Sequence, residues 1–334
     1  ALIGGATGMV GDPSGKKSER QLLDIDSINY NLNSQKKQLE QFLDFDCGEN
    51  SAEVVNNFDW FTSISFLDFI RDVGKHISVN YMMAKDSVKN RLEDGMSFTE
   101  FSYQLVQGFD FYHLWKEKNV KLQMGGSDQW GNIVTGTELI RRKGNGKGFS
   151  LTAPLITKSD GSKFGKSEGG NVWLDAEKTS PYQFYQFWMN TSDEDAERYI
   201  KIFTLHSKDY IEDIIKEHKN APHLRALQKD LAAYITKWVH GNSGYETALT
   251  ATDILFGKAT SDSLRNLSEN DFFSIFDGVK KHQVSDVKGI NVVDMCADSG
   301  FLASKSEAKR ALKENSVSVN GEKVTEDFYF SEAD

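Results

Sequence analysis

The chain has 334 residues, 39% of them hydrophobic and 26% charged, which is typical of a globular protein with two or three domains. Its net charge of −10 excludes a generally basic nucleic-acid binder, although an acidic body can still carry a local basic face. No apolar run is long enough to span a membrane, and Cys47 and Cys296 stand in no metal-binding or disulfide-framework spacing.

The first half alternates short apolar strands with helical patterns, which predicts an α/β fold with a mainly parallel sheet. A helical pattern near 65–73 is one of the connections. The chain begins without methionine, where an apolar strand runs into Gly4-Gly5, so we expect further residues upstream of Ala1. The expected strands are 1–3, 54–57, 120–124 and 151–156.

A glycine-rich loop follows the first strand and reads G-G-A-T-G-M-V-G-D-P-S-G-K from Gly4 to Lys16. It does not contain the dinucleotide fingerprint G-x-G-x-x-G. It is not a phosphate loop either, because Val10 stands where that motif needs its first glycine. Pro13 restricts Asp12 to extended or turn geometry, which can hold the carboxylate towards a ligand amine.

The segment 97–116 is predicted to be a helix, because Ser97 and Glu100 form a capping box at its start. At 3.6 residues per turn, Tyr103, Gln107 and Asp110 share one narrow face. This face is either the solvent side or, because its flanks are apolar, the wall of a polar-ligand pocket. The opposite face is expected to be a core stripe of Phe98, Phe101, Leu105, Phe109 and Tyr112.

The turn Gly125-Gly126-Ser127-Asp128-Gln129 follows the strand 120–124 and leads into another helix. Ligands of open α/β sheets bind at such carboxyl ends of strands. Asp128 can then reach a ribose hydroxyl, and Gln129 a substrate carboxylate. The alternative is an ordinary tight turn in which Asp128 caps the helix.

The segment Lys158 to Gly170 reads K-S-D-G-S-K-F-G-K-S-E-G-G and places Lys163 and Lys166 three residues apart. Its glycines and serines indicate a flexible loop that no core could hold. The phosphate-loop pattern fails here because Asp160 occupies the position of the first glycine. The segment is either a solvated connection or a loop whose two ammonium groups suit a triphosphate.

From Pro181 onward the patterns are helical, and Ser180-Pro181 is a good helix start. This predicts a separate helical domain with helices near 193–203, 207–219, 222–240 and 244–256.

The last fifty residues combine a helix at 303–313 with a hairpin around Asn320-Gly321. The helix carries one acid, Glu307, and is either the basic face of an RNA-binding module or a solvated amphipathic helix. The chain ends just after the hairpin, so we expect this module to be incomplete. The four cations of the helix are Lys305, Lys309, Arg310 and Lys313.

Four strings in this order resemble bacterial tyrosyl-tRNA synthetase, a class I aminoacyl-tRNA synthetase. They are G-G-A-T-G-M-V-G-D-P-S-G-K, Y-Q-L-V-Q-G-F-D, Q-M-G-G-S-D-Q-W-G-N and K-F-G-K-S, the last being similar to the K-M-S-K-S signature. The resemblance covers the whole chain. It implies a Rossmann-like catalytic domain at 1–180 whose first part is missing, with a helical insertion and the loop 158–170. An α-helical anticodon-binding domain at 181–282 and an incomplete alpha-L type RNA-binding module at 283–334 would follow.

The resemblance also implies the role of each site residue. Tyr103 and Gln107 would contact the amino group of tyrosine, with Asp12 as its charged partner, and Asp110 would accept a hydrogen bond from the phenol. Gln129 would contact the substrate carboxylate, and Gly126 and Asp128 would bind ATP. Lys163 and Lys166 would bind the pyrophosphate end of ATP and act in catalysis. The residues that would bind RNA are Lys305, Lys309, Arg310 and Lys313.

The expected partners are L-tyrosine, ATP with Mg²⁺, tRNA-Tyr and a second copy in a cytoplasmic homodimer, without a tightly bound cofactor or protein-held metal. The family's H-I-G-H signature is absent; it lies upstream of the glycine-rich loop in the family and is expected upstream of Ala1. Two alternatives remain. The first is a tryptophanyl-tRNA synthetase, which Asp110 and the K-F-G-K-S spelling disfavour. The second is a non-catalytic RNA-binding protein, which Lys163 and Lys166 disfavour but the missing H-I-G-H signature leaves open.

Overall fold

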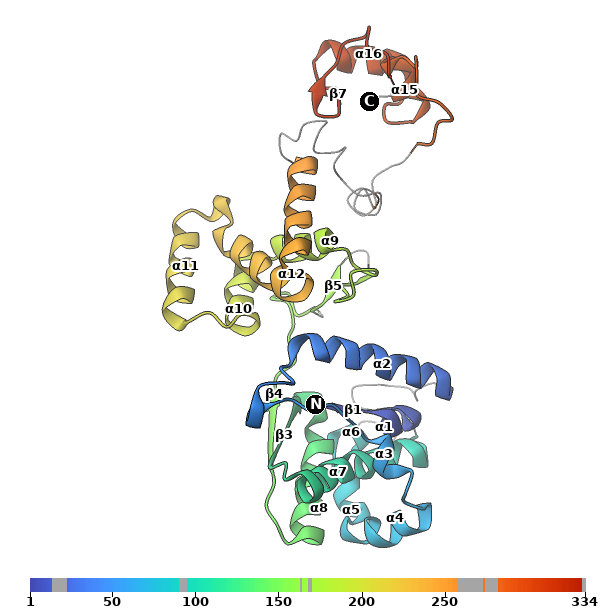
Figure 1. The fold of residues 1–334 in the computed structure, drawn as a ribbon, viewed down its shortest axis with the longest axis vertical. Coiled ribbons are helices and arrows are strands. Elements are labelled where there is room, and N and C mark those ends of the chain that lie inside the picture. Colours follow the sequence, from blue (N-terminus) through green and yellow to red (C-terminus); the bar gives the residue numbers. More distant parts are fainter. Residues whose placement is uncertain are drawn as a thin grey trace. The chain divides into compact units, whose positions relative to one another are not determined.

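The computed structural model describes residues 1–13, 23–89, 95–162, 164–167, 170–256, 273 and 282–331. The chain divides into two compact units, Ala1–Thr157 and Lys158–Asp334 (Figure 1). The domain assignment 1–180, 181–282 and 283–334 stays a prediction from the sequence.

The strands of the first unit form two parallel pairs. β1 (Leu2–Ile3) pairs with β2 (Val55–Asn56), and β3 (Leu122–Gly126) pairs with β4 (Phe149–Ala153). The parallel pairing expected from the alternating pattern is thus confirmed. The strand expected at 151–156 begins earlier, because the whole of β3 from Leu122 pairs with a partner that starts at Phe149.

The helix expected near 65–73 is α4, whose start is fixed by the Ser65 hydroxyl, which accepts from the Asp68 backbone N–H. The single-turn 3-10 helices η1 (Gly48–Asn50), η2 (Gly74–His76) and η3 (Ser127–Gln129) complete the first unit. Its α-helices are α1 (Gly5–Val10), α2 (Ile25–Phe42), α3 (Phe58–Phe61), α4 (Phe66–Asp72), α5 (Val79–Met83), α6 (Asp86–Lys89), α7 (Phe98–Lys118) and α8 (Trp130–Gly144).

Helices α7 and α8 pack closely because each has a glycine at the contact. A Cβ on Gly108 would lie 2.8 Å from a Thr135 side-chain carbon, and one on Gly136 would lie 2.7 Å from Phe111. Phe111 is fully buried at this contact. The contact therefore fixes the position of α7, the helix that carries the predicted ligand face.

The capping box of α7 is confirmed, since Ser97 and Glu100 exchange side-chain and backbone hydrogen bonds. Most of the expected core stripe packs into the main cluster, with Phe109 and Tyr112 buried. Phe98 does not. Its side chain is 66% exposed, because it is the first residue of the helix and projects beyond the packed turns.

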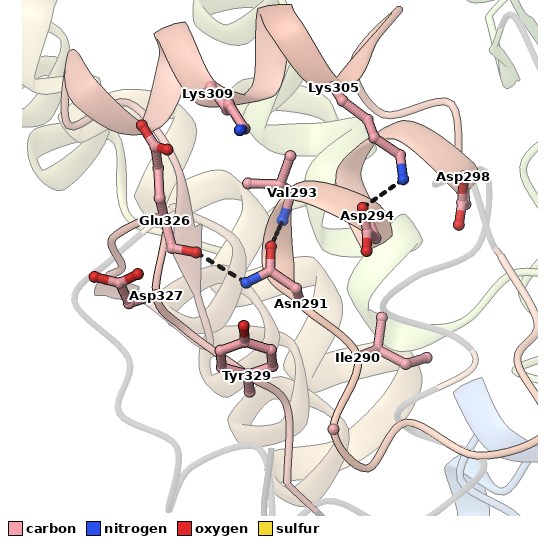
Figure 2. A pocket seen from close by; sticks show the side chains of 11 residues that line it. Ile290, Asn291, Val293, Asp294, Asp298, Lys305, Lys309, Glu326, Asp327 and Tyr329 are labelled. Carbon is pink, nitrogen blue, oxygen red and sulfur yellow. Dashed lines mark hydrogen bonds and ion pairs between the residues drawn. The ribbon is translucent and has the colours of Figure 1, made fainter.

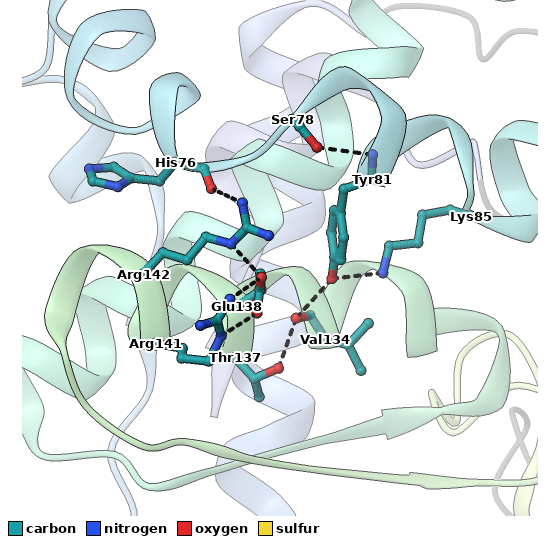
Figure 3. A network of polar contacts seen from close by, with 9 residues as sticks. All are labelled: His76, Ser78, Tyr81, Lys85, Val134, Thr137, Glu138, Arg141 and Arg142. Atoms are coloured by element: carbon teal, nitrogen blue, oxygen red, sulfur yellow. Dashed lines mark hydrogen bonds and ion pairs between the residues drawn. The ribbon is translucent and has the colours of Figure 1, made fainter.

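Polar contacts attach α8 to the helical segment before α7 (Figure 3). The Tyr81 hydroxyl of α5 donates to the Val134 carbonyl at 3.3 Å, and the Arg142 guanidinium donates to the His76 carbonyl at 3.1 Å. Arg142 is held in turn by the carboxylate of Glu138, one turn earlier on α8. One side chain of α5 and one of α8 thus join α8 to α5 and η2.

The second unit begins with a short antiparallel pair, β5 (Lys166–Ser167) and β6 (Gly170–Asn171), followed by helices. The predicted start at Ser180-Pro181 is confirmed by a capping box between Ser180 and Gln183. The helices are α9 (Pro181–Met189), α10 (Asp193–Phe203), α11 (Lys208–Asn220), the 3-10 turn η4 (Pro222–Leu224) and α12 (Ala226–Phe256).

The helix predicted at 222–240 starts too early. Pro222–Leu224 is a 3-10 turn, and Arg225 follows in the left-handed region with φ 52°, so α12 begins only at Ala226. The predicted break before 244 corresponds to a kink at Gly241, whose φ of 72° leaves the helical region.

The last part of the chain, 282–331, contains α15 (Val292–Asp298), α16 (Lys305–Lys313) and the hairpin β7 (Ser318–Val319) and β8 (Glu322–Lys323). Asn320 and Gly321 both have positive φ, 48° and 86°, as a type I′ turn requires. The predicted hairpin is therefore confirmed. Its side chains and the two helices share one small core: Val292, Val293, Cys296, Ala308, Leu312, Val317 and Val324.

None of the helices that the structure describes combines the length and apolar character needed to cross a membrane. Cys47 is an exposed free thiol and Cys296 a buried one.

Candidate active site

Asp110 is a buried carboxyl group at the centre of the first unit. Its side chain is 1% exposed, and its oxygens accept hydrogen bonds from Trp60 Nε1 at 2.9 Å and Asn57 Nδ2 at 3.0 Å. Burial raises the pKa of Asp110 to about 7, and the two hydrogen bonds only partly oppose this increase. Because a carboxylate has about four lone-pair sites, it can accept a further hydrogen bond from a ligand hydroxyl.

Asn57 connects this carboxyl group to the glycine-rich loop. Its side chain is fully buried; its Oδ1 accepts from the Ala6 N–H at 2.7 Å, and its Nδ2 also lies 3.0 Å from Thr7 Oγ1. Asn57, Trp60 and Thr7 were not predicted from the sequence. Asn57 follows β2, so its place at the carboxyl end of a strand was an available signal, whereas nothing local marked Trp60.

The predicted polar face of α7 is not a solvent side, since Tyr103 and Asp110 are buried and Gln107 is half-buried. Tyr103 is 6% exposed and lines, together with Asp12, Gly4 and Gly8, a cavity of about 560 Å³. Gln107 donates from Nε2 to Gln129 Oε1 at 3.2 Å.

The Oε1 atom of Gln107 is buried without a hydrogen-bond partner among the described residues. An unpaired buried acceptor is costly, so a ligand cation or N–H donor here would be favoured.

Gln129 joins the turn after β3 to the glycine-rich loop. Its Nε2 donates to Asp12 at 2.8 Å and to Asp128 at 3.0 Å, while its Oε1 also accepts from Asn132 at 3.3 Å. The structure thus brings together Asp12, Gln107, Asp128 and Gln129, which are far apart in the sequence. Asn132 was missed, although it lies one turn into α8.

Asp128 does not cap the helix after the turn. The residue at the helix start is Gln129, and neither η3 nor α8 has a side-chain cap. A Cβ on Gly126 would lie 2.5 Å from Asp128 Oδ1, so the glycine leaves room for that carboxylate. The alternative of an ordinary capped turn is therefore wrong.

The lysine loop belongs to the second unit. Lys163 lies outside the described residues, and Lys166 opens β5. Gly161, Gly165 and Gly170 have φ of 80°, 79° and 115°, so the glycines do take conformations that other residues rarely adopt.

The expectation that no core could hold this loop is wrong at Phe164. Its ring packs 5.0 Å from that of Tyr199. A single apolar residue anchors a segment whose composition is otherwise that of a solvated connection.

The basic face of α16 is partly neutralised by other elements (Figure 2). Lys305 pairs with Asp294 of α15 at 2.6 Å, and Lys313 lies 3.8 Å from Glu326. In the segment 282–331, no ion pair involves the exposed Lys309 or Arg310. Setting the four cations of this helix against Glu307 alone therefore overestimated the unpaired positive charge of this face.

Within the described ranges, no group of three or more His, Cys, Asp or Glu side chains is placed to hold a metal ion.

Comparison with known proteins gives family matches over nearly the whole chain. A family model described as tRNA synthetases class I (W and Y) matches residues 1–257. A second, described as Tyrosine--tRNA ligase SYY-like C-terminal domain, matches residues 271–334.

Two similar relatives are both named Tyrosine--tRNA ligase. Tyrosine--tRNA ligase of Flavobacterium johnsoniae is 57% identical over 344 aligned residues, which cover 100% of this chain and 80% of the relative. Tyrosine--tRNA ligase of Bacteroides thetaiotaomicron is 57% identical over 333 aligned residues, which cover 97% of this chain and 77% of the relative. The solved structure of a C-terminally truncated mitochondrial tyrosyl-tRNA synthetase of Aspergillus nidulans matches with a TM-score of 0.66 at 30% identity, over 76% of each chain.

These matches agree with the parallel strand pairs, the helical part and the small C-terminal module, and they confirm the Rossmann-like α/β fold class. The chain therefore belongs to the class I aminoacyl-tRNA synthetases, as a member of the tyrosyl-tRNA synthetase family.

Proposed function

We propose that the buried site of the first unit is the tyrosine site of this tyrosine–tRNA ligase. The tryptophanyl alternative and the non-catalytic RNA-binding alternative are set aside, since the relatives are ligases named for tyrosine. The observation that carries the proposal is Asp110, a buried carboxyl group held by two neutral donors and, within the part of the chain that the structure describes, paired with no cation. Such a group favours a ligand with a buried hydroxyl donor, and the phenol of tyrosine is one.

The other end of the ligand is proposed to lie at Tyr103, Gln107 and Asp12. Gln107 Oε1 is a buried acceptor for which the described residues supply no donor, and Asp12 supplies a carboxylate, so together they suit an ammonium group. Tyr103 and Asp110 are two helical turns apart, about 10 Å along the axis. This separation is of the same order as the length of a tyrosine molecule. Gln129 would then lie near the substrate carboxylate. The neighbouring Asp128 and Gly126 are proposed to bind the ribose of ATP.

The reaction has two steps. The tyrosine carboxylate attacks the α-phosphorus of ATP, the bond to pyrophosphate breaks, and tyrosyl-adenylate forms. A ribose hydroxyl at the 3′ end of tRNA-Tyr then attacks the mixed anhydride and releases AMP. No covalent enzyme intermediate is needed, so the side chains act by positioning and by stabilising developing charge. Lys163 and Lys166 are proposed to bind the leaving pyrophosphate, and Mg²⁺ is proposed to enter with the phosphates of ATP.

The function is tested by tyrosine-dependent exchange of labelled pyrophosphate into ATP, measured on the full-length protein. We expect exchange with tyrosine and none with tryptophan. Exchange that depends on tryptophan, or tRNA binding without any exchange, would overturn the proposal in favour of one of the two alternatives.

The helical part is proposed to bind the anticodon region, and the module 282–331 to contact the tRNA backbone. Its four cations are not equivalent, since Lys305 and Lys313 form ion pairs with Asp294 and Glu326, whereas within 282–331 no ion pair involves Lys309 or Arg310. We expect Lys309→Ala with Arg310→Ala to weaken tRNA binding several-fold and to reduce the slope of log K against log salt by roughly one to two. Lys305→Ala with Lys313→Ala is the matched control and should have a smaller effect.

Filter binding at several salt concentrations measures the binding constant for tRNA and its salt dependence, and adenylate formation should stay unchanged in both double variants. Equal losses in the two double variants would show that pairing with acids does not decide which cations contact RNA.

A cytoplasmic homodimer is proposed as well. Six large apolar side chains between 66 and 98 are 40% to 76% exposed, more than a monomer usually shows on one stretch. They are Phe66, Leu67, Ile70, Val79, Met83 and Phe98. A second copy that covers them would give twice the monomer mass in sedimentation equilibrium, and a monomeric mass at micromolar concentration would refute it.

A further inference from the structure

The lysine loop is attached to the helices of the second unit at Phe164, the residue before Gly165-Lys166. The Phe164 ring lies 5.0 Å from Tyr199 and 5.2 Å from Phe203, stacked on the latter. It also lies 5.7 Å from Trp188 and 5.9 Å from Phe187. Four rings from α9 and α10 thus surround one side chain of a loop that otherwise consists of polar residues, lysines and glycines.

A second attachment lies five residues earlier in the chain. Ser159 donates from its backbone N–H to Asp195 Oδ1 at 2.8 Å and from its hydroxyl to Oδ2 at 3.3 Å. Asp195 is 6% exposed and lies in the first turn of α10. A buried carboxylate that receives two hydrogen bonds from one loop residue fixes the position of that residue.

Tyr199 connects the two attachments. Its ring packs on Phe164, and its hydroxyl is hydrogen-bonded to Asp195. Burial and the neighbouring carboxylate raise the pKa of Tyr199 to about 12, so the hydroxyl stays a donor at neutral pH. Ser159, Asp195, Tyr199 and Phe164 therefore form one continuous set of contacts within the second unit.

Neither Asp195 nor Phe164 has a charge or group suited to bind pyrophosphate at the loop itself. Asp195 is an anion, which would repel phosphates, and Phe164 is half-buried among rings. Their contacts act instead on the path of the backbone. Gly165, which stands between Phe164 and Lys166, has a φ of 79°, a conformation that other residues rarely adopt. A lysine on a free loop loses much conformational entropy when it binds, and prior attachment of its neighbours reduces that cost.

We propose that Phe164 and Asp195 are positioning residues for adenylate formation, which hold the loop so that Lys166 reaches the leaving pyrophosphate. The inference rests on the proposed function of the loop. The four rings around Phe164 would then serve adenylate formation by fixing the loop, in addition to packing the helices.

The test uses the full-length enzyme and the single-turnover rate of adenylate formation. Phe164→Ala is expected to lower this rate about 10- to 100-fold, the loss typical of a misplaced catalytic group, with tyrosine affinity unchanged. Phe164→Met should recover most of the rate, because a flexible apolar side chain can fill the same space. Asp195→Asn, which keeps the shape but weakens the bonds from Ser159, should give a smaller decrease.

Tyr245→Ala is the matched control, because Tyr245 packs on Tyr185 in the same helical bundle and touches neither attachment. It should lower the unfolding midpoint as Phe164→Ala does but leave the rate unchanged. Equal rates for Phe164→Ala and Tyr245→Ala would overturn the proposal and leave Phe164 as packing. Lys166→Ala, measured in parallel, separates the positioning role of Phe164 from the proposed function of the loop. If Lys166→Ala is slow while Phe164→Ala is not, only the positioning role fails. If neither variant is slow, the proposed function of the loop fails.

Discussion

Replacing Asp110 by alanine is expected to raise the Michaelis constant for tyrosine about 10- to 100-fold, the value of a hydrogen bond to a charged or partly charged group. Phenylalanine lacks the phenol, so its activation should change little. The ratio of the two specificity constants should fall accordingly. Pyrophosphate exchange with each amino acid measures both, and an unchanged ratio would show that Asp110 does not read the phenol.

The variant also removes the acceptor of the Trp60 indole N–H and one of the two acceptors of Asn57 Nδ2, which keeps only Thr7 Oγ1. This costs stability, and a loss of activity could follow from misfolding alone. The affinity for ATP, which does not depend on the phenol contact, is the control. It should stay within about twofold of that of the wild type.

The pH dependence of stability gives an independent check on the same carboxyl group. In the folded protein its pKa is about 7 instead of 3.8, so the folded state binds the proton more tightly than the unfolded state. This contribution is fully present below the ordinary pKa and is lost as the pH rises towards 7. We expect the difference in unfolding free energy between wild type and Asp110→Ala to fall over this interval by at most about 4 kcal/mol. Hydrogen exchange of α7 peptides in urea measures it, and a constant difference would contradict the raised pKa.

The helix of Tyr103, Gln107 and Asp110 shows what could be predicted from the sequence. Its capping box fixes the start of the helix, and the helical period then decides which residues share a face, so both were correct. What surrounds that face could not be predicted. Asn57 and Trp60 reach Asp110 from 53 and 50 positions earlier, through a parallel strand pair whose register depends on the whole fold.

The lysine loop shows the opposite case. Local composition indicated a permissive backbone, and Gly161 and Gly165 do have positive φ, because backbone freedom is a property of the residue itself. The burial of Phe164 could not be predicted. It depends on four rings from two helices that follow later in the chain, and no local pattern reports such a contact.

Replacing Lys166 by alanine is expected to lower the rate of adenylate formation about 100- to 1000-fold, as removal of one donor to a developing oxyanion does elsewhere. Tyrosine affinity should remain nearly intact, since the residues proposed to bind the amino acid all belong to the first unit. The reason is that pyrophosphate gains charge only as its bond to the α-phosphorus breaks, so the ammonium group contributes mainly in the transition state.

Single-turnover formation of tyrosyl-adenylate measures the rate, and equilibrium dialysis measures tyrosine binding. Lys158→Ala is the matched control, because it removes the same charge from the same loop outside the K-F-G-K-S string. A similar loss in both variants would point to the net charge of the loop instead of to one placed ammonium group. A parallel loss of tyrosine affinity would indicate misfolding. If Lys166→Ala is slow and Lys158→Ala is not, the transition-state contribution resides in the Lys166 side chain. If Phe164→Ala is slow as well, the contacts of Phe164 and Asp195 are the structural reason why that side chain is in place when the bond breaks.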